Sequence, residues 1–185
     1  MRKTLLLAGV ACLFAAQAQA TDYFSKPYVG LDLGGTKLEY SNKISGGDTD
    51  AIFVANLNFG LKFNDYFGLE LSSQASSETD VENVFDLSYS SIGIDAVGYL
   101  PCSSKVELFA MAGVGYYNFD LKYNLKLDDI ELHLTKNDTA FRAGLGAQYN
   151  INEKWALRSM VRYHHIDNDL FDYIGDITVG VRYNF

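Results

Sequence analysis

Residues 177–185, Ile-Thr-Val-Gly-Val-Arg-Tyr-Asn-Phe, alternate between apolar residues and residues that are polar or small. The apolar members are Ile177, Val179, Val181, Tyr183 and Phe185. A period of two places successive side chains on opposite faces of a strand, whereas a helix would scatter the apolar set around its circumference. The segment is therefore predicted to be a β-strand with one apolar and one polar face.

The same period recurs along most of the chain. We expect eight such strands, at about residues 27–40, 51–64, 66–77, 86–100, 105–121, 139–151, 154–167 and 173–185. Asn64-Asp65, Pro101 to Ser104 and Asn152-Glu153 form tight turns, whereas the other four connections are long and polar. Short turns at one end and long loops at the other are typical of an outer-membrane β-barrel.

A soluble β-sandwich is the alternative, because its strands also alternate. Here, however, the apolar face carries almost no charge, and the opposite face is rich in Gly, Asn and charged residues. Glycine would weaken strands that face bulk water, but it fits the crowded interior of a small barrel. The strands are also long enough to cross a bilayer at a tilt. The predicted fold is all-β: an eight-stranded antiparallel up-and-down transmembrane β-barrel.

Aromatic residues gather near both ends of the predicted strands, as in the interfacial girdles of membrane barrels. The group near the tight turns is Phe63, Tyr66, Phe67, Tyr149, Trp155, Tyr183 and Phe185. The group near the long loops is Tyr40, Phe53, Tyr116, Phe119, Phe141, Tyr163 and Tyr173.

The N-terminal residues 1–20 have the pattern of a cleaved signal peptide, which leaves residues 21–185 as the barrel domain. A basic Met1-Arg2-Lys3 precedes an apolar run, and Ala18-Gln19-Ala20 supplies the small residues of a cleavage site. Removal of Arg2 and Lys3 leaves 13 basic residues (15 − 2) against 23 acidic ones, so the net charge moves from −8 to −10. That balance disfavours nucleic acid as a partner. Cys102 is the one cysteine after the signal, which excludes an intramolecular disulfide.

Three segments carry a resemblance to a known family: residues 27–34 (PYVGLDLG), 143–149 (AGLGAQY) and 179–185 (VGVRYNF). Their order and spacing resemble the OmpA-type and related small outer-membrane barrels. The resemblance implies a monomer in the outer membrane of a Gram-negative bacterium, surrounded by lipid and lipopolysaccharide. It also implies that the barrel-assembly machinery recognises the C-terminal signal formed by Val179, Val181, Tyr183 and Phe185.

The string YVGLDLGGTK, residues 28–37, also resembles the phosphate-binding opening of sugar kinases with an actin-like fold. The chain is too short for that two-lobed architecture, has no second phosphate motif, and would not meet cytoplasmic ATP after export. In the barrel, Leu31 and Leu33 are instead expected to face lipid. Gly30, Asp32 and Gly34 are expected to face the interior.

The alternation predicts that charges of both signs point inward: Asp32, Lys62, Glu70, Asp95, Glu107, Arg142, Arg158, Arg162, Asp176 and Arg182. Side chains can fill the interior of an eight-stranded barrel, and buried charges need partners. We expect Arg182 or Arg158 to meet Asp32 or Glu70. The interior is thus predicted to be a plug of paired charges. The alternative is a small porin with a narrow ion-conducting lumen.

An enzyme that modifies lipids is the least favoured alternative. Residues 163–168, Tyr-His-His-Ile-Asp-Asn, superficially resemble the site of the lipid A deacylase barrels, but Asp167 stands where the serine nucleophile is needed. His164 is expected to point inward and His165 to lie near the outer interface. The three histidines share no metal-ligand spacing. No catalytic residue, metal or cofactor is assigned.

Residues 122–138 have a strand-like pattern of their own. Leu125, Leu127, Ile130, Leu132 and Leu134 alternate with polar residues around Asp128-Asp129. This pattern predicts a hairpin that carries two strands beyond the membrane. Its apolar face either packs on other extracellular loops or binds a host or cell-surface protein. The predicted function is therefore structural or surface-interactive.

Overall fold

The computed structural model describes residues 26–40, 52–77, 79–81, 85–124, 131–166 and 171–185, and these form antiparallel strands joined by turns. The strands are β1 (Lys26–Tyr40), β2 (Ile52–Lys62), β3 (Phe67–Ser76), β4 (Thr79–Val81), β5 (Phe85–Pro101), β6 (Val106–Asn124), β7 (Glu131–Asn150), β8 (Trp155–Ile166) and β9 (Phe171–Asn184). Among the described residues, no helix has the length and apolar character needed to span a bilayer.

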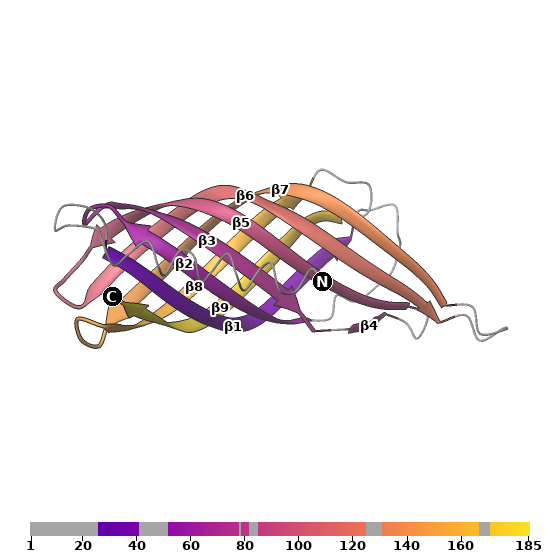
Figure 1. Ribbon diagram of the computed structural model, residues 1–185, viewed down its shortest axis with the longest axis horizontal. Helices are drawn as coiled ribbons and strands as arrows, with labels where there is room; N and C mark the ends of the chain where they lie inside the picture. The colour runs from indigo at the N-terminus through magenta and orange to yellow at the C-terminus, as the bar shows by residue number, and fades with distance from the viewer. Residues whose placement is uncertain (1–25, 41–51, 78, 82–84, 125–130, 167–170) are drawn as a thin grey trace.

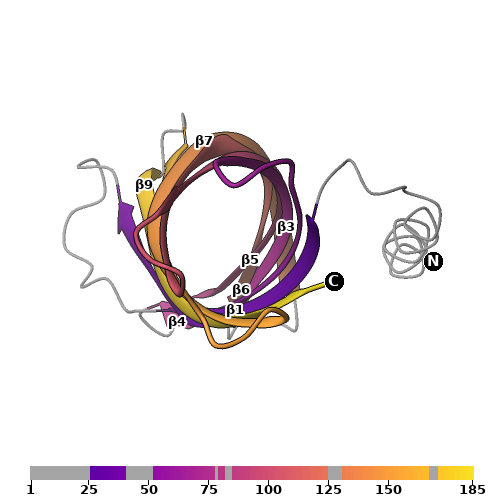
Figure 2. The same cartoon turned by 90° about the vertical axis from the view of Figure 1, so that its left-hand side faces the viewer.

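The eight long strands close into a barrel, as the sequence predicted. The strand order is β3-β2-β1-β9-β8-β7-β6-β5-β4, and β3 also pairs with β5, which completes the ring. Figure 2 shows this ring from the end that carries the short turns. The N-terminal and C-terminal strands lie side by side, with Leu31 opposite Val181. Closure leaves the eight long strands without a free edge within the wall, which satisfies their backbone groups in lipid.

Three tight turns share one local device. The side-chain oxygens of Asn64, Ser103 and Asn152 each accept hydrogen bonds from the backbone N–H groups two and three residues later. Asn and Ser favour such turns because their short side chains reach their own backbone. The three predicted turns therefore lie at one end of the barrel, which we call the turn end; the opposite end is the long-loop end (Figure 1).

The predicted faces of the strands are confirmed. Phe141 and Leu145 are 72% and 69% exposed on the outside, and Leu31 and Leu33 also face outward. Asp32, between them, is buried in the interior. An apolar exterior around a polar, buried interior is the reverse of a soluble domain and matches a barrel whose solvent is lipid.

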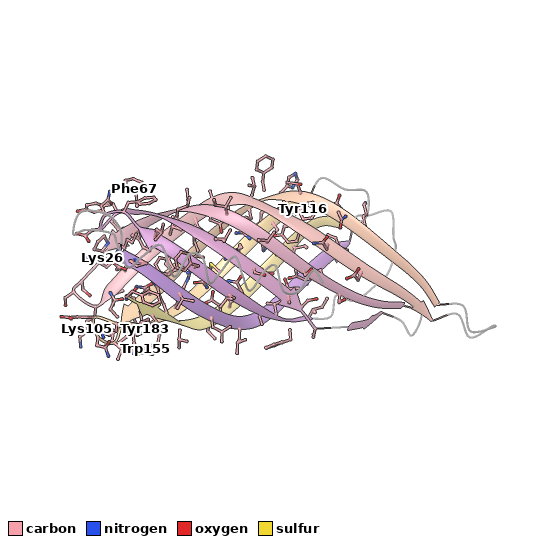
Figure 3. All side chains as sticks on the ribbon, in the orientation of Figure 1. Lys26, Phe67, Lys105, Tyr116, Trp155 and Tyr183 are labelled. Carbon is pink, nitrogen blue, oxygen red and sulfur yellow. The ribbon has the colours of Figure 1, made fainter. Side chains whose placement is uncertain are left out.

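Aromatic side chains are exposed at both ends. Figure 3 places Phe67, Trp155 and Tyr183 at the turn end and Tyr116 nearer the long-loop end. The prediction for Phe119 was wrong, because this ring is buried and packs against Tyr117 and Tyr89 inside the barrel. Tyr116 faces outward, so the period of two directs position 119 inward. The side chains of Tyr40 and Tyr173 lie outside the described residues.

The wall is uneven in height. β6 and β7 have 19 and 20 residues, whereas β2 and β3 have 11 and 10. The last pair between β7 and β8 is Ala140↔Ile166, but β6 and β7 stay paired as far as Asn124↔Glu131. β5 accompanies β6 to Phe85↔Tyr123. These three strands form a protruding sheet at the long-loop end, and β7 begins earlier than the predicted residue 139 (Figure 1).

Candidate functional site: the charged interior and the protruding sheet

The structure places all ten charged residues of the predicted network inside the barrel, none of them more than 9% exposed. Five are basic and five are acidic: Lys62, Arg142, Arg158, Arg162 and Arg182 against Asp32, Glu70, Asp95, Glu107 and Asp176. Formal charge within this set therefore balances.

At the turn end, Lys62 Nζ lies 2.6 Å from Glu107 Oε1. Arg182 reaches across from β9, donates to Gln148 Oε1 at 2.8 Å, and stacks its guanidinium 3.2 Å from the centre of the Tyr28 ring. A cavity of about 650 Å³ opens here, and Lys62, Glu107 and Arg182 line it. These contacts therefore stand between the open mouth and the barrel interior.

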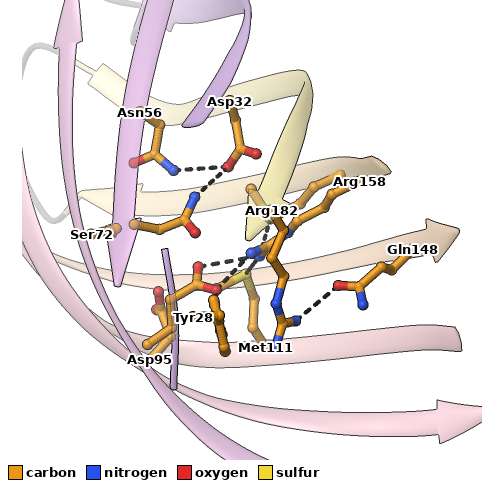
Figure 4. Close-up of polar contacts among 12 residues, drawn as sticks. Tyr28, Asp32, Asn56, Ser72, Asp95, Met111, Gln148, Arg158 and Arg182 are labelled. Atoms are coloured by element: carbon orange, nitrogen blue, oxygen red, sulfur yellow. Dashed lines mark hydrogen bonds and ion pairs between the residues drawn. The ribbon is translucent and has the colours of Figure 1, made fainter. Parts of the chain in front are cut away.

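The next layer centres on Arg158 and Glu70, which are both fully enclosed (Figure 4). Arg158 Nη1 and Nη2 donate to the two Glu70 oxygens at 2.6 and 3.2 Å, and Tyr28 donates to Glu70 at 2.7 Å. Gly60 makes this possible, since a Cβ there would collide with the Tyr28 ring. The structure thus joins one of the anticipated pairs across the barrel. Arg182 meets Tyr28 and Gln148 instead of a carboxylate.

Asp32 is held differently. Its Oδ2 accepts from Asn56 and Asn58 at 3.1 and 2.8 Å, both on the neighbouring β2. Within the described residues it has no ion-pair partner, and neither does Arg162. The buried carboxyl group of Asp32 thus takes its hydrogen bonds from amide donors in place of a cation.

Further up, Arg142 spans from β7 to β5 and β3. Its Nε and Nη2 donate to the two Asp95 oxygens at 2.7 and 2.5 Å, and Nη2 also donates to Ser72 at 2.7 Å. Gly93 leaves room for the guanidinium, because a Cβ at that position would collide with it. This fork is the geometry in which arginine and carboxylate pair most strongly.

Nearest the long loops, Asp176 gathers several polar groups. His164 Nε2 lies 2.8 Å from Asp176 Oδ2, and Gln74 donates to the same oxygen at 2.9 Å. Thr36 donates to the other oxygen, and the Tyr117 hydroxyl contacts His164 Nδ1. His164 therefore points inward, and His165 is exposed on the outside.

Sequence reasoning missed several members of these layers: Tyr28, Thr36, Ser72, Gln74, Tyr89, Tyr99 and Tyr117. Each occupies an inward position by the period of two, so alternation alone marks them as interior residues. Their charge neutrality hid them, because only formal charges were followed.

The remaining predicted residues have simple positions. Val179, Val181 and Phe185 are exposed to the outside of β9, and the Tyr183 ring packs against those of Trp155 and Phe185 at 4.9 and 5.2 Å between centroids. Of the predicted hairpin, Leu125, Leu127 and Ile130 lie outside the described residues. Positions 132 and 134 belong to β7 and pair with Tyr123 and Leu121. In the described part of the chain, no cluster of three or more His, Cys, Asp or Glu could hold a metal.

Three solved structures with this fold are distant from the chain in sequence. Neisserial surface protein A superposes with a TM-score of 0.70 at 18% identity, over 86% of this chain and 97% of that one. Ail, the attachment invasion locus protein of Yersinia pestis, gives 0.64 at 16% identity, over 88% and 99%. The N-terminal barrel domain of Pseudomonas aeruginosa OprF gives 0.60 at 15% identity, over 87% and 99%. At these identities the likeness shows the fold alone.

Comparison with curated proteins gives no match. The family model described as "Outer membrane protein beta-barrel domain" matches residues 5–185, which is nearly the whole chain. The match agrees with the closed antiparallel ring, the apolar exterior and the buried charges. The chain therefore belongs to the outer membrane protein beta-barrel domain family and is a protein of the outer membrane.

Proposed function

We propose that this protein is a sealed outer-membrane barrel that acts at the cell surface by binding another protein along its protruding sheet. The observation that carries the proposal is the continuation of the β6–β7 ladder to Asn124↔Glu131, past the last β7–β8 pair at Ala140↔Ile166. Residues 131–139 of β7 thus pair with β6 on one side and with no described strand on the other.

An edge of that kind is a template for an added strand. The backbone N–H and C=O groups of alternate residues point away from β6, and an extended segment of a partner can pair with them. The nine residues that have no second partner strand among the described residues span roughly 30 Å at about 3.3 Å per residue. The outward positions beside it, Asn118, Asp120, Asn137 and Thr139, are polar, so a partner would meet hydrogen-bonding side chains there. This is the adhesive role that the hairpin pattern suggested.

The charge of the chain bears on the kind of partner. One structure of Ail holds the heparin analogue sucrose octasulfate. The chain has a net charge of −8, which becomes −10 without Arg2 and Lys3, so a highly sulfated polyanion would be repelled. A protein partner with a neutral or basic surface fits better. Proteins of the host or of neighbouring cells are candidates in that class.

The interior supports a sealed barrel over a small porin. Four buried pairs, Lys62–Glu107, Arg158–Glu70, Arg142–Asp95 and His164–Asp176, follow one another along the axis. A permeating ion would have to separate or displace them, and each is enclosed in a medium of low dielectric constant. The narrow-porin alternative predicts steady conductance across a planar bilayer.

The position of His164 in the interior also disfavours an enzymatic function. His164 is fully buried between Asp176 and Tyr117, with both ring nitrogens engaged. A substrate lipid outside the wall could not reach it. We therefore propose a non-enzymatic protein without a cofactor or resident metal.

We also propose how the protein is exported and assembled. Residues 1–20 would act as a signal peptide removed on export, and residues 21–185 would form the mature monomeric barrel. Val179, Val181, Tyr183 and Phe185 would be read by the barrel-assembly machinery. Lipid and lipopolysaccharide would then surround the apolar exterior.

Deletion of residues 124–134 tests the surface role. A second variant replaces the same eleven positions with a Gly-Ser linker, which keeps the length of the chain but not the strand pairing. We expect both variants to fold, as judged by the mobility of unboiled samples on a gel, and both to lose binding to host-cell proteins immobilised on a surface. Binding equal to that of the unaltered barrel would exclude the protruding sheet as the interaction surface.

A further inference from the structure

The only two methionines beyond Met1 meet inside the barrel. Met111 on β6 and Met160 on β8 are 4% and 3% exposed and share one buried cluster. The strand between them, β7, carries Gly144 opposite Met111. A Cβ at Gly144 would lie 3.1 Å from Met111 Cγ and 3.4 Å from its sulfur. The glycine therefore lets the Met111 side chain lie across β7 toward Met160.

Two guanidinium groups converge on the two sulfur atoms. Arg158 Nη2 lies 3.9 Å from the Met111 sulfur and 3.5 Å from the Met160 sulfur. Arg162 Nη2 lies 3.8 and 3.6 Å from the same two atoms. Arg158 and Arg162 flank Met160 on β8, so strand geometry alone directs all three side chains into the interior.

The two guanidinium groups carry more N–H donors than the surrounding described residues offer acceptors for. Nε of Arg158 and Nε of Arg162 are buried and have no hydrogen-bond partner. A thioether sulfur is a weak acceptor, so it satisfies a guanidinium poorly. Arg158 is anchored by Glu70 (Figure 4), whereas the described residues offer Arg162 no carboxylate within ion-pair distance. Among the described residues, Arg162 Nη2 therefore meets only weak sulfur acceptors.

We propose that Met111 and Met160 form an oxidation site at which hydrogen peroxide converts thioether to sulfoxide, and that the sulfoxide is stabilised by Arg158 and Arg162. Oxidation of a buried methionine usually disrupts a core, because it places a polar group among apolar ones. Here the new oxygen would be a strong acceptor beside the Nη2 atoms of Arg158 and Arg162, which lie between 3.5 and 3.9 Å from the two sulfurs. The usual penalty is offset by charge-assisted hydrogen bonds.

The chemistry is a two-electron oxygen transfer. A sulfur lone pair attacks one peroxide oxygen and forms the S–O bond, while the O–O bond breaks. The departing oxygen takes up the remaining proton, so that thioether plus H₂O₂ gives sulfoxide plus H₂O. Peroxide is small and can both donate and accept hydrogen bonds, so a charged interior with unsatisfied donors admits it more readily than an apolar core would.

The test treats the folded barrel in detergent with hydrogen peroxide and follows uptake of oxygen atoms by intact-mass and peptide mass spectrometry. A Lys105→Met variant places a methionine in an exposed turn and supplies a reference rate within the same molecule. The Met111→Leu/Met160→Leu double variant is the blank. We expect uptake of one or two oxygens, assigned to Met111 and Met160, without loss of the folded band on an unboiled gel.

The melting temperature then shows whether the folded barrel tolerates the sulfoxides or is destabilised by them. The oxidised barrel should melt within about 3 °C of the untreated one, whereas oxidation of an Arg162→Gln variant should lower its melting temperature by more than about 5 °C. A folded barrel that takes up no oxygen at these positions, while the urea-unfolded chain does, would overturn the proposal. So would an equal fall in melting temperature in both backgrounds. Should Arg162→Gln not fold, a fall of more than about 5 °C in the unaltered barrel overturns it as well.

Discussion

Arg158 and Glu70 form an enclosed ion pair in the described interior, with side chains 3% and 0% exposed. A buried pair adds little stability over an apolar replacement of the same volume, because desolvation opposes the attraction between the charges. Removal of one partner is different, since the other charge is then left buried and uncompensated. The pair is therefore expected to affect stability mainly when one of its two charges is removed and the other is left without a partner.

A mutant cycle at this pair tests that view. Arg158→Ala should lower the free energy of unfolding by about 3–5 kcal/mol, because Glu70 keeps only its hydrogen bond from Tyr28. Arg158→Met combined with Glu70→Leu should recover most of that loss. Urea titration monitored by fluorescence of Trp155, the single tryptophan, measures both. An Arg158→Ala barrel as stable as the unaltered one would remove the main support for the charge-paired interior.

Glycines on the inner face act by leaving space. Gly60→Ala should lower the free energy of unfolding by about 1–3 kcal/mol, since its Cβ would collide with the Tyr28 ring that donates to Glu70. Gly35→Ala is the control on the outer face of β1, because the nearest atom to its Cβ is 3.9 Å away. That control should be neutral or slightly stabilising. The same urea titration compares the two, and equal effects would show that strand propensity, not space, explains glycine here.

At the scale of the element, β9 closes the barrel against β1 and β8, and the exposed aromatic residue Phe185 follows its last residue, Asn184. Phe185 donates its backbone N–H to Pro27 O at 3.0 Å, and its ring contacts Tyr183. Its side chain is 55% exposed, so it buries little surface within the protein. A substitution of Phe185 can therefore distinguish a role of this residue in recognition during assembly from a role in the stability of the folded barrel.

Phe185→Ala should lower the amount of folded barrel in bacterial outer membranes several-fold, and leave the melting temperature of barrel refolded in detergent within about 3 °C. Phe53→Ala is the control, because Phe53 is an equally exposed aromatic residue, at 54%, on β2. It should leave both quantities nearly unchanged. Quantification of heat-modifiable protein in isolated membranes provides the first measurement. Parallel losses in both variants would mean that any girdle aromatic serves assembly equally.

At the scale of the whole molecule, the successive buried ion pairs along the barrel axis predict that the barrel does not conduct ions. Refolded protein in a planar bilayer should show no steady conductance steps, because the paired charges fill the path of an ion. Mobility of the unboiled sample on a gel establishes that the inserted protein is folded. Reproducible steps from a folded barrel would favour the small-porin function and would place the interaction role second.

Alternation along the chain was enough to predict the all-β class, the eight wall strands, the three tight turns and the lipid-facing positions such as Leu31 and Leu145. Those properties are local, since a period of two assigns each side chain to a face without reference to any other strand. Phe119 shows the limit: it was placed by its nearness to a strand end, against its own parity, and the ring is buried.

The tertiary structure alone decided which residues meet inside. Arg158 reaches Glu70, 88 positions away along the chain, and Arg142 reaches Asp95 on a strand that is not its neighbour. These contacts depend on the register between strands, on the closure of β3 onto β5, and on glycines that let long side chains cross. None of these is encoded in the period of a single strand. Closure of the ring converts a list of inward charges into pairs, and it brings two methionines and two arginines to one point.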